Sequence, residues 1–441
     1  MPVDKNLLHD LKARGLVFQS TDEKALNEHL QQSRVIYAGF DPTADSLHLG
    51  NLMVLMFLRR FQLAGHKTIA LVGGATGLIG DPGGRTEERQ LNSADVVENW
   101  TNKIKSQVSR FIDFDCGENS AIVVNNLDWV GPMTMIPFLR DVGKHFSVNA
   151  MIKKDSVKTR LERDEVGISY TEFSYMILQA LDYHHLHEQY GCTVQLGGSD
   201  QWGNITAGVD LVRRLDENEE TKHVHALSLP LLTKADGTKY GKTAGGAIWL
   251  DAERTSPYAF YQFCLNIPDE DVEKFLNFFS FKPLTEIAEI VAVHKADPGQ
   301  RLGQRTVAQE LTALVHGAEA VTAAEHISAV VFAREDDKWS RLSEADFKQL
   351  AQGGLPSSTA AEPQLQILAA LSQTELATSN RQAREFIDAG SVKVNGQLVP
   401  KGSYDLPVLA ADAFYGKFTV LQVGKKKVHI LAWPAAARRS A

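Results

Sequence analysis

The feature that most constrains the fold is an alternation of short apolar runs with helical patterns in the first half of the chain. Four apolar runs have the length and composition of buried strands: 35–40 (VIYAGF), 68–74 (TIALVGG), 121–126 (AIVVNN) and 192–198 (CTVQLGG). A helical pattern from Asn51 to Ala64, closed by Gly65, separates the first two. Strands that alternate with helices predict an α/β fold around a parallel sheet.

The later part of the chain changes character, and 441 residues are too many for one ordinary domain. From Pro257 to about Ala333 the pattern is helical; Thr285 is predicted to cap one helix, and Gly317 to close another over 299–316. The composition of 353–363 (GGLPSSTAAEP) predicts a linker. The predicted organisation is an α/β domain, a helical domain, a linker and a small α+β domain: 1–250, 251–335, 336–370 and 371–441.

The C-terminal residues combine turn signals with basic charge. Ser379 is predicted to cap a short helix that ends at Gly390, and Asn395-Gly396 predicts a hairpin. Residues 372–441 hold ten Lys or Arg against five Asp or Glu, a net charge of +5; the rest of the chain carries −13, for a total of −8. A basic tail on an acidic body favours a polyanionic partner, with an ordinary solvated surface as the alternative.

Composition argues against other classes of protein. Hydrophobic residues make up 44% and charged residues 23%, a typical globular balance. No apolar run approaches the ~20 residues that cross a bilayer, and the charged N-terminus has no signal-peptide core. The three cysteines lie far apart without metal-binding spacing: Cys116, Cys192 and Cys264. These features predict a cytoplasmic protein with reduced thiols.

The junction after the first strand, 38–51 (AGFDPTADSLHLGN), concentrates polar residues at the start of a helix. His48, Gly50 and Asn51 would lie at the helix N-terminus, where exposed N–H groups and the helix dipole favour anions. Thr43 and His48 can donate hydrogen bonds to a phosphate. Ligand crevices lie beyond the carboxyl ends of parallel strands, so the junction predicts a nucleotide-phosphate site. The alternative is a capped helix with an exposed histidine.

A second basic motif, KYGKT (239–243), lies in a glycine-rich stretch that can bring Lys239 and Lys242 onto phosphates. Alone it is also typical of surface loops. HLGN after the first strand and KYGKT after the last resemble the HIGH and KMSKS signatures of class I aminoacyl-tRNA synthetases, which have a Rossmann-like catalytic domain. Asn51 replaces the second histidine of the first signature, and either side chain can hydrogen-bond a ribose or phosphate oxygen.

Two motifs that suggest other cofactors are rejected. The run 73–84 (GGATGLIGDPGG) lacks GK[ST] and the G-x-G-x-x-G spacing, so neither a P-loop nor a dinucleotide site is predicted. It is expected to let the backbone pass close to a small ligand, with Asp81 pointing in. The histidines of YHHLH (His184, His185, His187) have no evident carboxylate or cysteine partner, so no protein-held metal is predicted.

Residues 169–185 (SYTEFSYMILQALDYHH) predict one largely apolar helix, with Ser169 and Glu172 as a capping box. Tyr175, Gln179 and Asp182 share one face of it. An unpaired buried polar group costs about 1–3 kcal/mol, so this polar stripe needs partners. A bound amino acid would supply them, and neighbouring backbone groups are the alternative.

The order of five segments narrows the resemblance to bacterial tyrosyl-tRNA synthetases and covers most of the chain: YAGFDPTADSLHLGN, GGATGLIGDPGGRT, SYTEFSYMILQALDY, QLGGSDQWGN and KYGKT. It implies a tyrosine site with the phenol at Tyr37 and Asp182, the ammonium at Tyr175, Gln179 and Asp81, and the carboxylate at Gln201. It implies ATP contacts at Gly39, Asp41, His48, Gly50, Asn51, Gly198, Asp200 (ribose) and Lys242. It also implies catalytic stabilisation of the phosphates by Thr43, His48, Arg85, Arg89, Lys239 and Lys242.

The implied reaction is the ligation of tyrosine to tRNA in two steps. Tyrosine and ATP give tyrosyl-adenylate and pyrophosphate, and the tyrosyl group then passes to the terminal ribose of tRNA(Tyr). The attacking carboxylate is already ionised, so no general base is needed, and Mg²⁺ arrives with ATP. Phenylalanine would leave Tyr37 and Asp182 unpaired, which favours tyrosine as the substrate.

The segment 379–399 (SNRQAREFIDAGSVKVNGQLV) resembles the αL RNA-binding module at the C-terminus of the same family. The resemblance implies tRNA contacts at Arg381, Arg384 and Lys393, and basic groups of this kind bind phosphates without reading sequence. It also implies a homodimer, for which 129–151 is the expected surface.

Three alternatives stay open. The related tryptophan enzyme shares the fold, but it would not need Tyr37 and Asp182 to face a hydroxyl, and it usually lacks the αL module. An inactive RNA-binding paralogue is disfavoured by the intact HLGN and KYGKT motifs and by Asp182. A small HIGH-type nucleotidyltransferase would be much shorter and would carry no RNA module.

Overall fold

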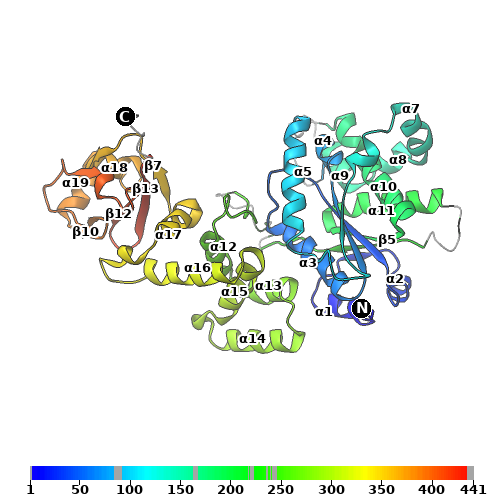
Figure 1. Cartoon of the computed structure of the whole chain (residues 1–441), viewed down its shortest axis with the longest axis horizontal. Coiled ribbons are helices and arrows are strands. Elements are labelled where there is room, and N and C mark those ends of the chain that lie inside the picture. The colour runs from blue at the N-terminus through cyan, green and yellow to red at the C-terminus, as the bar shows by residue number, and fades with distance from the viewer. Residues whose placement is uncertain are drawn as a thin grey trace. The chain divides into compact units, whose positions relative to one another are not determined.

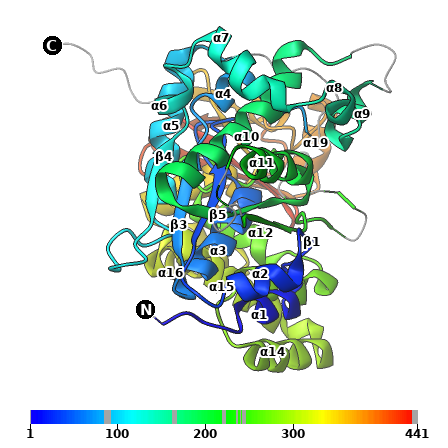
Figure 2. The same ribbon diagram turned by 90° about the vertical axis from the view of Figure 1, so that its right-hand side faces the viewer.

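The computed structural model describes residues 2–83, 92–161, 167–216, 218, 223–234, 237–238, 240 and 246–434 (Figures 1 and 2). The chain divides into two compact units, one of residues 1–250 with 273–291 and one of residues 251–272 with 292–441. The sequence-based domains placed all of 251–335 in a helical domain, whereas the structure groups 273–291 with the first unit. None of the described helices is both long and apolar enough to cross a bilayer.

The first unit is built on a six-stranded sheet with the order β1-β6-β5-β2-β3-β4. The strands are β1 (Gln19–Ser20), β2 (Val35–Phe40), β3 (Lys67–Val72), β4 (Ile122–Asn125), β5 (Cys192–Gly198) and β6 (His225–Leu229). All neighbours are parallel except β1, which pairs antiparallel with β6. The parallel sheet and its four predicted strands are confirmed, and the sequence analysis missed β1 and β6.

Helices cover both faces of this sheet. The longest are α3 (Leu49–Leu63), α5 (Ala94–Val108), α10 (Tyr170–Tyr190) and α11 (Trp202–Leu215). Figure 1 shows α3 and α5 on one side of the strands and α10 and α11 on the other. Shorter helices complete the unit: α1 (Leu7–Ala13), α2 (Glu23–His29), α4 (Thr76–Ile79), α6 (Leu127–Val130), α7 (Met135–Pro137), α8 (Val148–Ile152) and α9 (Asp155–Leu161). A core that includes Tyr37, Tyr183 and Ile205 fills the space between the sheet and α10 and α11.

The helical part of the chain contains α12 (Pro257–Leu265), α13 (Val272–Phe279), α14 (Leu284–Ala296), α15 (Leu302–His316) and α16 (Ala318–Val331). Helices α12, α15 and α16 pack against one another. The prediction that Thr285 caps a helix is wrong, because α14 already begins at Leu284. Helix α15 ends at His316 before Gly317, as predicted.

The C-terminal residues form a small α+β module with helices α17 (Glu344–Gln349), α18 (Ile367–Gln373) and α19 (Asn380–Asp388). Its five-stranded sheet contains β7 (Ser357–Thr359), β9 (Val392–Val394), β10 (Gln397–Leu398), β12 (Phe418–Val423) and β13 (Lys427–Ala432). Strands β8 (Gln364–Gln366) and β11 (Pro407–Leu409) form a separate pair. The Ser379 cap of α19 and the Asn395-Gly396 hairpin are confirmed.

The segment 353–363, which its composition predicts as a linker, contains a strand. Strand β7 pairs in parallel with the last strand, β13, and so extends the sheet of the module. Backbone groups make the pairing, with one side-chain contact between Oγ of Ser358 and Nε2 of His429 at 2.9 Å, and Ser357 and Thr359 are exposed. A composition rich in small and polar residues therefore did not exclude an edge strand here.

The C-terminal module contacts the helical part of the second unit through α17, where Gln349 accepts hydrogen bonds from the hydroxyl of Ser256 (2.8 Å) and the N–H of Tyr258 (3.1 Å). The ring of Phe347 stacks on Phe414 and Phe418 at centroid distances of 5.0 and 5.6 Å. At the tip of the β9–β10 hairpin, a Cβ on Gly396 would lie 1.9 Å from the carbonyl oxygen of Asp336. The hairpin and an aromatic stack therefore fix the module by direct packing.

Gly396→Ala is expected to loosen this docking. Gly396 has a φ of +84°, where alanine costs roughly 1–2 kcal/mol, and the clash with Asp336 adds about 1–3 kcal/mol of overpacking. Gly402→Ala is the matched control, since Gly402 has a φ of +77° with nothing within 4 Å. Thermal unfolding should show a clearly larger loss of stability for Gly396→Ala; equal losses would contradict the docking contact.

Candidate active site

A cavity of about 340 Å³ opens at the carboxyl ends of the parallel strands. It lies where the strand order diverges, between β2 and β5, the position at which open α/β sheets bind ligands. Every described residue for which the sequence predicted a tyrosine, nucleotide or phosphate contact lines it: Tyr37, Gly39, Asp41, Thr43, His48, Gly50, Asn51, Asp81, Tyr175, Gln179, Asp182, Gly198, Asp200 and Gln201. The structure thus brings together segments that are up to 164 positions apart in sequence, from Tyr37 to Gln201.

Four predicted phosphate contacts lie outside the described residues: Arg85, Arg89, Lys239 and Lys242. Of the KYGKT motif the structure describes Tyr240, which is buried and lines the cavity.

His48 and Asn51 cap the helix that follows β2. His48 is the N-cap residue of α3, and its Nδ1 accepts hydrogen bonds from the N–H groups of Gly50 (3.1 Å) and Asn51 (3.3 Å). In return, Oδ1 of Asn51 accepts from the N–H of His48 at 3.1 Å. A neutral imidazole whose Nδ1 accepts carries its proton on Nε2. The cap therefore fixes His48 as an Nε2–H donor and leaves only the Nδ2 of Asn51 for a nucleotide contact.

Asp41 is the centre of a hydrogen-bonded group at the end of β2. Its carboxylate accepts from the hydroxyls of Tyr175 (2.6 Å) and Thr76 (2.7 Å). A Cβ on Gly73 would lie 2.0 Å from Oδ1 of Asp41, so this position requires glycine. The first glycine of the run 73–84 thus makes room for a side chain of the protein, whereas the sequence analysis attributed the run to a bound ligand.

Asp182 is a fully buried carboxylate held by two neutral donors. It accepts from Nδ2 of Asn126 and from Nε1 of Trp129, both at 2.9 Å. Burial raises the pKa of Asp182 to about 7, although the two hydrogen bonds lower it. Asn126 also donates to Oγ1 of Thr76 at 3.0 Å, which joins the Asp182 and Asp41 groups.

Three polar atoms of the cavity wall are buried without a hydrogen-bond partner among the described residues. They are the hydroxyl of Tyr37 and the Oε1 atoms of Gln179 and Gln195. Burial, and after it the charge of Asp182, raises the pKa of Tyr37 well above its ordinary value. Unpaired buried polar groups cost about 1–3 kcal/mol each, so the cavity is arranged for a ligand with its own polar groups.

The side chains of Asp81 and Gln201 are joined by a hydrogen bond. Nε2 of Gln201 donates to Oδ2 of Asp81 at 2.5 Å, and the N–H of Gly83 donates to Oδ1 at 2.9 Å. Nδ2 of Asn204 donates to Oε1 of Gln201 at 3.2 Å. The predicted ammonium and carboxylate contacts thus stand side by side at one place in the cavity.

The sequence analysis missed four residues of this site: Thr76, Asn126, Trp129 and Gln195. Asn126 could have been found, because it directly follows β4 and the ends of parallel strands meet at one edge of the sheet. Gln195 lies inside β5, where nothing in the sequence distinguishes it from a core position. Trp129 resembles an ordinary apolar residue until its indole is seen to donate to Asp182.

The histidines of YHHLH each have a partner in the structure, including carboxylates that the sequence analysis did not find. His187 contacts the carbonyl of Cys192 and the carboxylate of Asp216, each at 2.9 Å. His184 lies 3.5 Å from Glu188, and His185 stacks on Trp129. The described residues contain no group of three or more His, Cys, Asp or Glu that could hold a metal.

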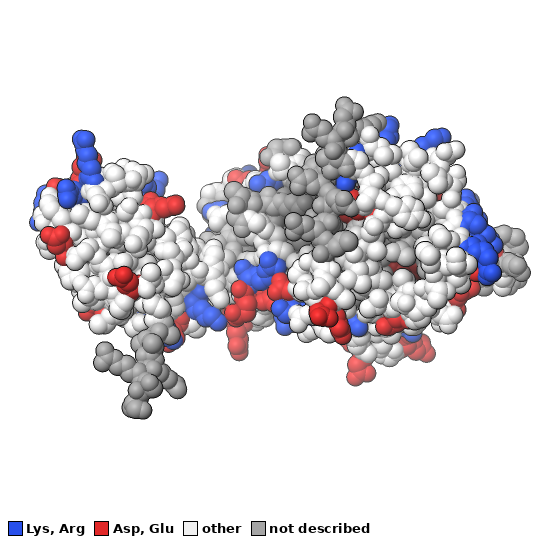
Figure 3. All heavy atoms as spheres, turned by 90° about the horizontal axis from the view of Figure 1, so that it is seen from above, with Lys and Arg blue, Asp and Glu red and all other residues white. Residues whose placement is uncertain are grey.

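The predicted tRNA contacts lie on the C-terminal module. Arg381 is 91% exposed and pairs with Glu385 at 3.1 Å, and the guanidinium of Arg384 lies over the ring of Tyr404. Lys393 pairs with Asp336 and is largely covered. Figure 3 shows basic side chains of the module interspersed with acidic ones on the visible face.

Comparison with known proteins identifies the family. The family model "tRNA synthetases class I (W and Y)" matches residues 29–333, and the model "Tyrosine--tRNA ligase SYY-like C-terminal domain" matches residues 346–431. The chain therefore belongs to the class I tRNA synthetases of the tryptophan and tyrosine family, and its Rossmann-like fold is the one expected from the resemblance.

Two curated relatives and one solved structure that resemble this chain are enzymes for tyrosine. The tyrosine–tRNA ligase of Aliivibrio salmonicida is 52% identical over 434 residues, 98% of this chain and 100% of the relative. The tyrosine–tRNA ligase of Escherichia coli O139:H28 is 51% identical over 429 residues, 97% and 99% of the two chains. A solved C-terminally truncated mitochondrial tyrosyl-tRNA synthetase of Aspergillus nidulans is 31% identical with a TM-score of 0.66, covering 74% of this chain and 94% of that one.

The raised pKa of Asp182 leads to a prediction about pH. Between about pH 4 and pH 7 the Asp182 carboxyl keeps its proton in the folded protein but has lost it in the unfolded chain. Asp182 therefore contributes stability that is fully present below about pH 4 and is lost as the pH rises through 7. The indole N–H resonance of Trp129 should titrate with a midpoint near pH 7 in the ligand-free protein. Trp129→Phe assigns the signal, and Asp182→Asn should abolish the titration. An indole signal that does not move between pH 5 and 9 would refute the raised pKa.

Proposed function

We propose that this chain is a tyrosine–tRNA ligase that activates L-tyrosine with ATP and then transfers the tyrosyl group to the terminal ribose of tRNA(Tyr). The observation that carries the proposal is a pair of buried, interacting groups that line the cavity, the hydroxyl of Tyr37 and the carboxylate of Asp182. The near full-length likeness to tyrosine–tRNA ligases supports it, and makes an inactive paralogue or a short nucleotidyltransferase a poorer interpretation.

The Tyr37–Asp182 end of the cavity is complementary to a phenol. A substrate hydroxyl can donate to Asp182 and accept from Tyr37, which satisfies both buried groups. Phenylalanine would remove this hydroxyl, so the buried hydroxyl of Tyr37 would stay without a partner and Asp182 would keep only its bonds to Asn126 and Trp129. Trp129 and Asn126 hold the carboxylate in place, so the selection rests on a rigid acceptor.

The polar groups nearer the middle of the cavity suit the amino-acid backbone. We assign the substrate ammonium to Tyr175, Gln179 and Asp81, of which Gln179 has an unpaired buried Oε1. The substrate carboxylate is assigned to Gln201, which stands beside Asp81. This order directs the carboxylate toward the end of the cavity that contains His48.

The nucleotide is assigned to the opposite end. Residues at the ends of β2 and β5 and at the start of α3 would hold ATP: Gly39, Asp41, His48, Gly50, Asn51, Gly198 and, at the ribose, Asp200. The capped His48 supplies an Nε2–H donor there, and Thr43 a hydroxyl. Lys239, Lys242, Arg85 and Arg89 are proposed as phosphate contacts from the family resemblance alone. Mg²⁺ enters as part of the MgATP substrate.

The proposed chemistry requires positioning and charge stabilisation rather than a base. The tyrosine carboxylate is ionised at neutral pH and attacks the α-phosphate, and pyrophosphate leaves. Donors fixed before the reaction stabilise the charge that develops on the phosphates, and each typically contributes ~10²–10³ in rate. The reciprocal cap of His48 with Asn51 is such a fixed donor arrangement.

We also propose a tRNA-binding surface, a homodimer and a cytoplasmic location. Arg381, Arg384 and Lys393 would contact tRNA phosphates from α19 and the adjoining strand. Exposed apolar side chains within 129–151 form a patch suited to a second copy: Met133, Met135, Ile136, Leu139 and Val148. Three unpaired cysteines support a reducing compartment.

Amino-acid-dependent ATP–pyrophosphate exchange, run with all twenty amino acids, tests the function. Exchange with tyrosine alone is expected. Exchange with tryptophan would move the assignment to the sister enzyme, and no exchange from a folded, tRNA-binding sample would favour the inactive paralogue.

Tyr37→Phe is expected to weaken tyrosine selection without loss of fold. The change removes one hydroxyl that pairs with the substrate, so KM for tyrosine should rise by about 10-fold and discrimination against phenylalanine should fall. Tyr183→Phe is the control, because the Tyr183 ring adjoins Tyr37 while its hydroxyl bonds to the carbonyl of His225. Equal effects of the two changes on selectivity would contradict the assignment.

Removing charge from α19 should separate the two reaction steps. Arg381→Gln and Arg384→Gln should each lower kcat/KM for tRNA and reduce the salt dependence of tRNA binding by about one counterion, while leaving pyrophosphate exchange unchanged. Lys393→Gln should have a smaller effect, since Lys393 is already paired with Asp336. Lys103→Gln, which breaks an exposed pair in the first unit, is the control. Unchanged aminoacylation in both arginine variants would remove α19 from the tRNA surface.

A further inference from the structure

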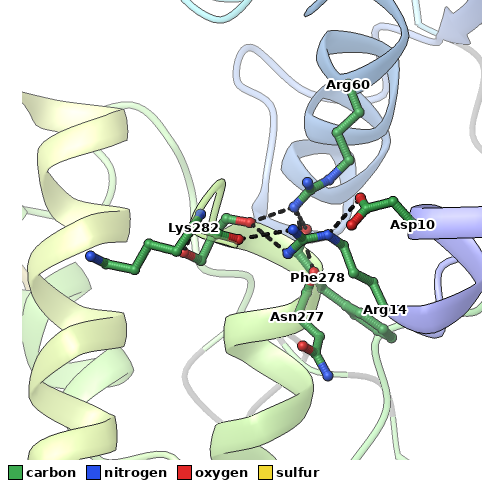
Figure 4. A network of polar contacts seen from close by, with 7 residues as sticks. Asp10, Arg14, Arg60, Asn277, Phe278 and Lys282 are labelled. Atoms are coloured by element: carbon green, nitrogen blue, oxygen red, sulfur yellow. Dashed lines mark hydrogen bonds and ion pairs between the residues drawn. The ribbon is translucent and has the colours of Figure 1, made fainter. Parts of the chain in front are cut away.

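Two buried arginines from separate helices converge on the C-terminal end of α13 (Figure 4). Arg60, near the end of α3, donates to the carbonyl of Ser280 at 2.6 Å and reaches the carbonyls of Asn277 and Phe278 at 3.5 Å. Arg14, which follows α1, donates to the carbonyls of Lys282 at 2.8 Å and Ser280 at 3.4 Å. We call Arg14 and Arg60 the arginine clamp.

Burial of the arginine clamp costs free energy, because two like charges are removed from water close to each other. Arg14 and Arg60 are 5% and 6% exposed, and burial together with their mutual repulsion lowers the pKa of Arg60 to about 10. The negative end of the α13 dipole and the carboxylate of Asp10, 2.8 Å from Nε of Arg14, offset the two charges. The clamp thereby holds 273–291 in the first unit, away from the helical grouping that the sequence predicted.

The other end of α13 supports the wall of the cavity. Nζ of Lys274 donates to the carbonyl of Thr233 at 2.7 Å, and the ring of Phe275 meets the edge of Tyr240 at 5.0 Å. The N–H of Tyr240 donates to the carbonyl of Leu232 at 2.9 Å. Leu231, Leu232 and Tyr240 all line the cavity, and a Cβ on Gly198 would be 3.5 Å from Leu231. This wall therefore belongs to the proposed nucleotide end.

The helix that carries Arg60 also carries His48. Helix α3 begins at the His48 cap, and Arg60 lies in its last turn. One end of α3 thus faces the nucleotide end of the cavity, and the other end is tied to α13. Helix α13 in turn contacts Tyr240, which also lines the cavity.

We propose that the arginine clamp positions the two walls of the nucleotide end, His48 on α3 and the wall formed by Leu231, Leu232 and Tyr240, relative to each other. Arg14 and Arg60 are positioning residues that act through α13, and neither lines the cavity. The inference rests on the proposed tyrosine–tRNA ligase function. It predicts that Arg14 and Arg60 affect the binding of ATP and do not affect the binding of tyrosine at Tyr37 and Asp182.

Steady-state pyrophosphate exchange with Arg60→Met and Lys274→Met tests this role from both ends of α13. Misplacement of a wall by a fraction of an ångström should raise KM for ATP about 10-fold in each variant, with KM for tyrosine changed by less than about 2-fold. Arg59→Met is the matched control. Arg59 lies 5.3 Å from the same Phe281 ring that Arg60 covers at 4.6 Å, and no hydrogen bond joins it to the described carbonyls of α13.

Combining the changes distinguishes a shared path from two local defects. Arg60 and Lys274 act on one helix from opposite ends, so the double variant should raise KM for ATP by less than the product of the single effects. Thermal unfolding accompanies each assay, and Arg14→Lys, which keeps the charge, serves as a milder variant if Arg60→Met does not fold. It should again raise KM for ATP selectively.

The outcomes separate the two proposals. A wild-type protein without tyrosine-dependent exchange would refute the ligase function itself. If the wild type exchanges, the clamp proposal is overturned by an Arg60→Met variant that matches Arg59→Met. Equal rises in KM for ATP and tyrosine, or a normal KM for ATP in Lys274→Met, would overturn it as well.

Discussion

The position of the site depends on a reversal of strand order at β2. The chain adds β3 and β4 on one side of β2 and then β5 and β6 on the other. Strand β2 has the parallel neighbours β3 and β5. Helix α3, which leads from β2 to β3, lies on one face of the sheet, and α10 and α11, which precede and follow β5, lie on the other. Connections that separate in this way leave a crevice at the carboxyl ends of β2 and β5. Polar residues placed directly after a strand can then serve the crevice without breaking the core: Asp41 after β2 lines it, and Asn126 after β4 donates to Asp182, which lines it.

Two buried charges of the first unit, on Asp182 and Arg60, are hydrogen-bonded to neutral groups. Asp182 is surrounded by an amide and an indole N–H, and Arg60 by backbone carbonyls. A fixed neutral dipole in place of a counter-ion stabilises the buried charge without burying a second one. It also leaves Asp182 able to respond to a ligand hydroxyl, because its hydrogen bonds to the described residues come from neutral donors. The Arg160–Glu172 pair, with both side chains almost fully buried, is the conventional alternative in the same unit.

The sequence predicted the fold and most of the site because both rest on local patterns. Strands β2 to β5 were recognisable from apolar runs, and Tyr175, Gln179 and Asp182 from their spacing on one helix. The sequence analysis missed Gln195 and Trp129, because no local sequence pattern marks a single polar side chain on a buried strand or the N–H group of an indole. The sequence analysis failed to predict the placement of α13 for another reason. Its attachment depends on Arg14 and Arg60, which are more than 200 residues away in sequence.

The groups proposed to select the amino acid differ in kind from those expected to act on phosphate. The proposed selecting groups Tyr37 and Asp182 are buried, as is Asn126, which donates to Asp182. The predicted phosphate contacts fall between strands in the sequence, at the His48 junction, after β3 and in KYGKT, and of these residues the structure describes Thr43 and His48. Tyrosine presents one shape to its site, whereas the phosphates must be bound and pyrophosphate released in every turnover. A rigid pocket suits the first task, and loops braced from behind, as α13 braces Tyr240, suit the second.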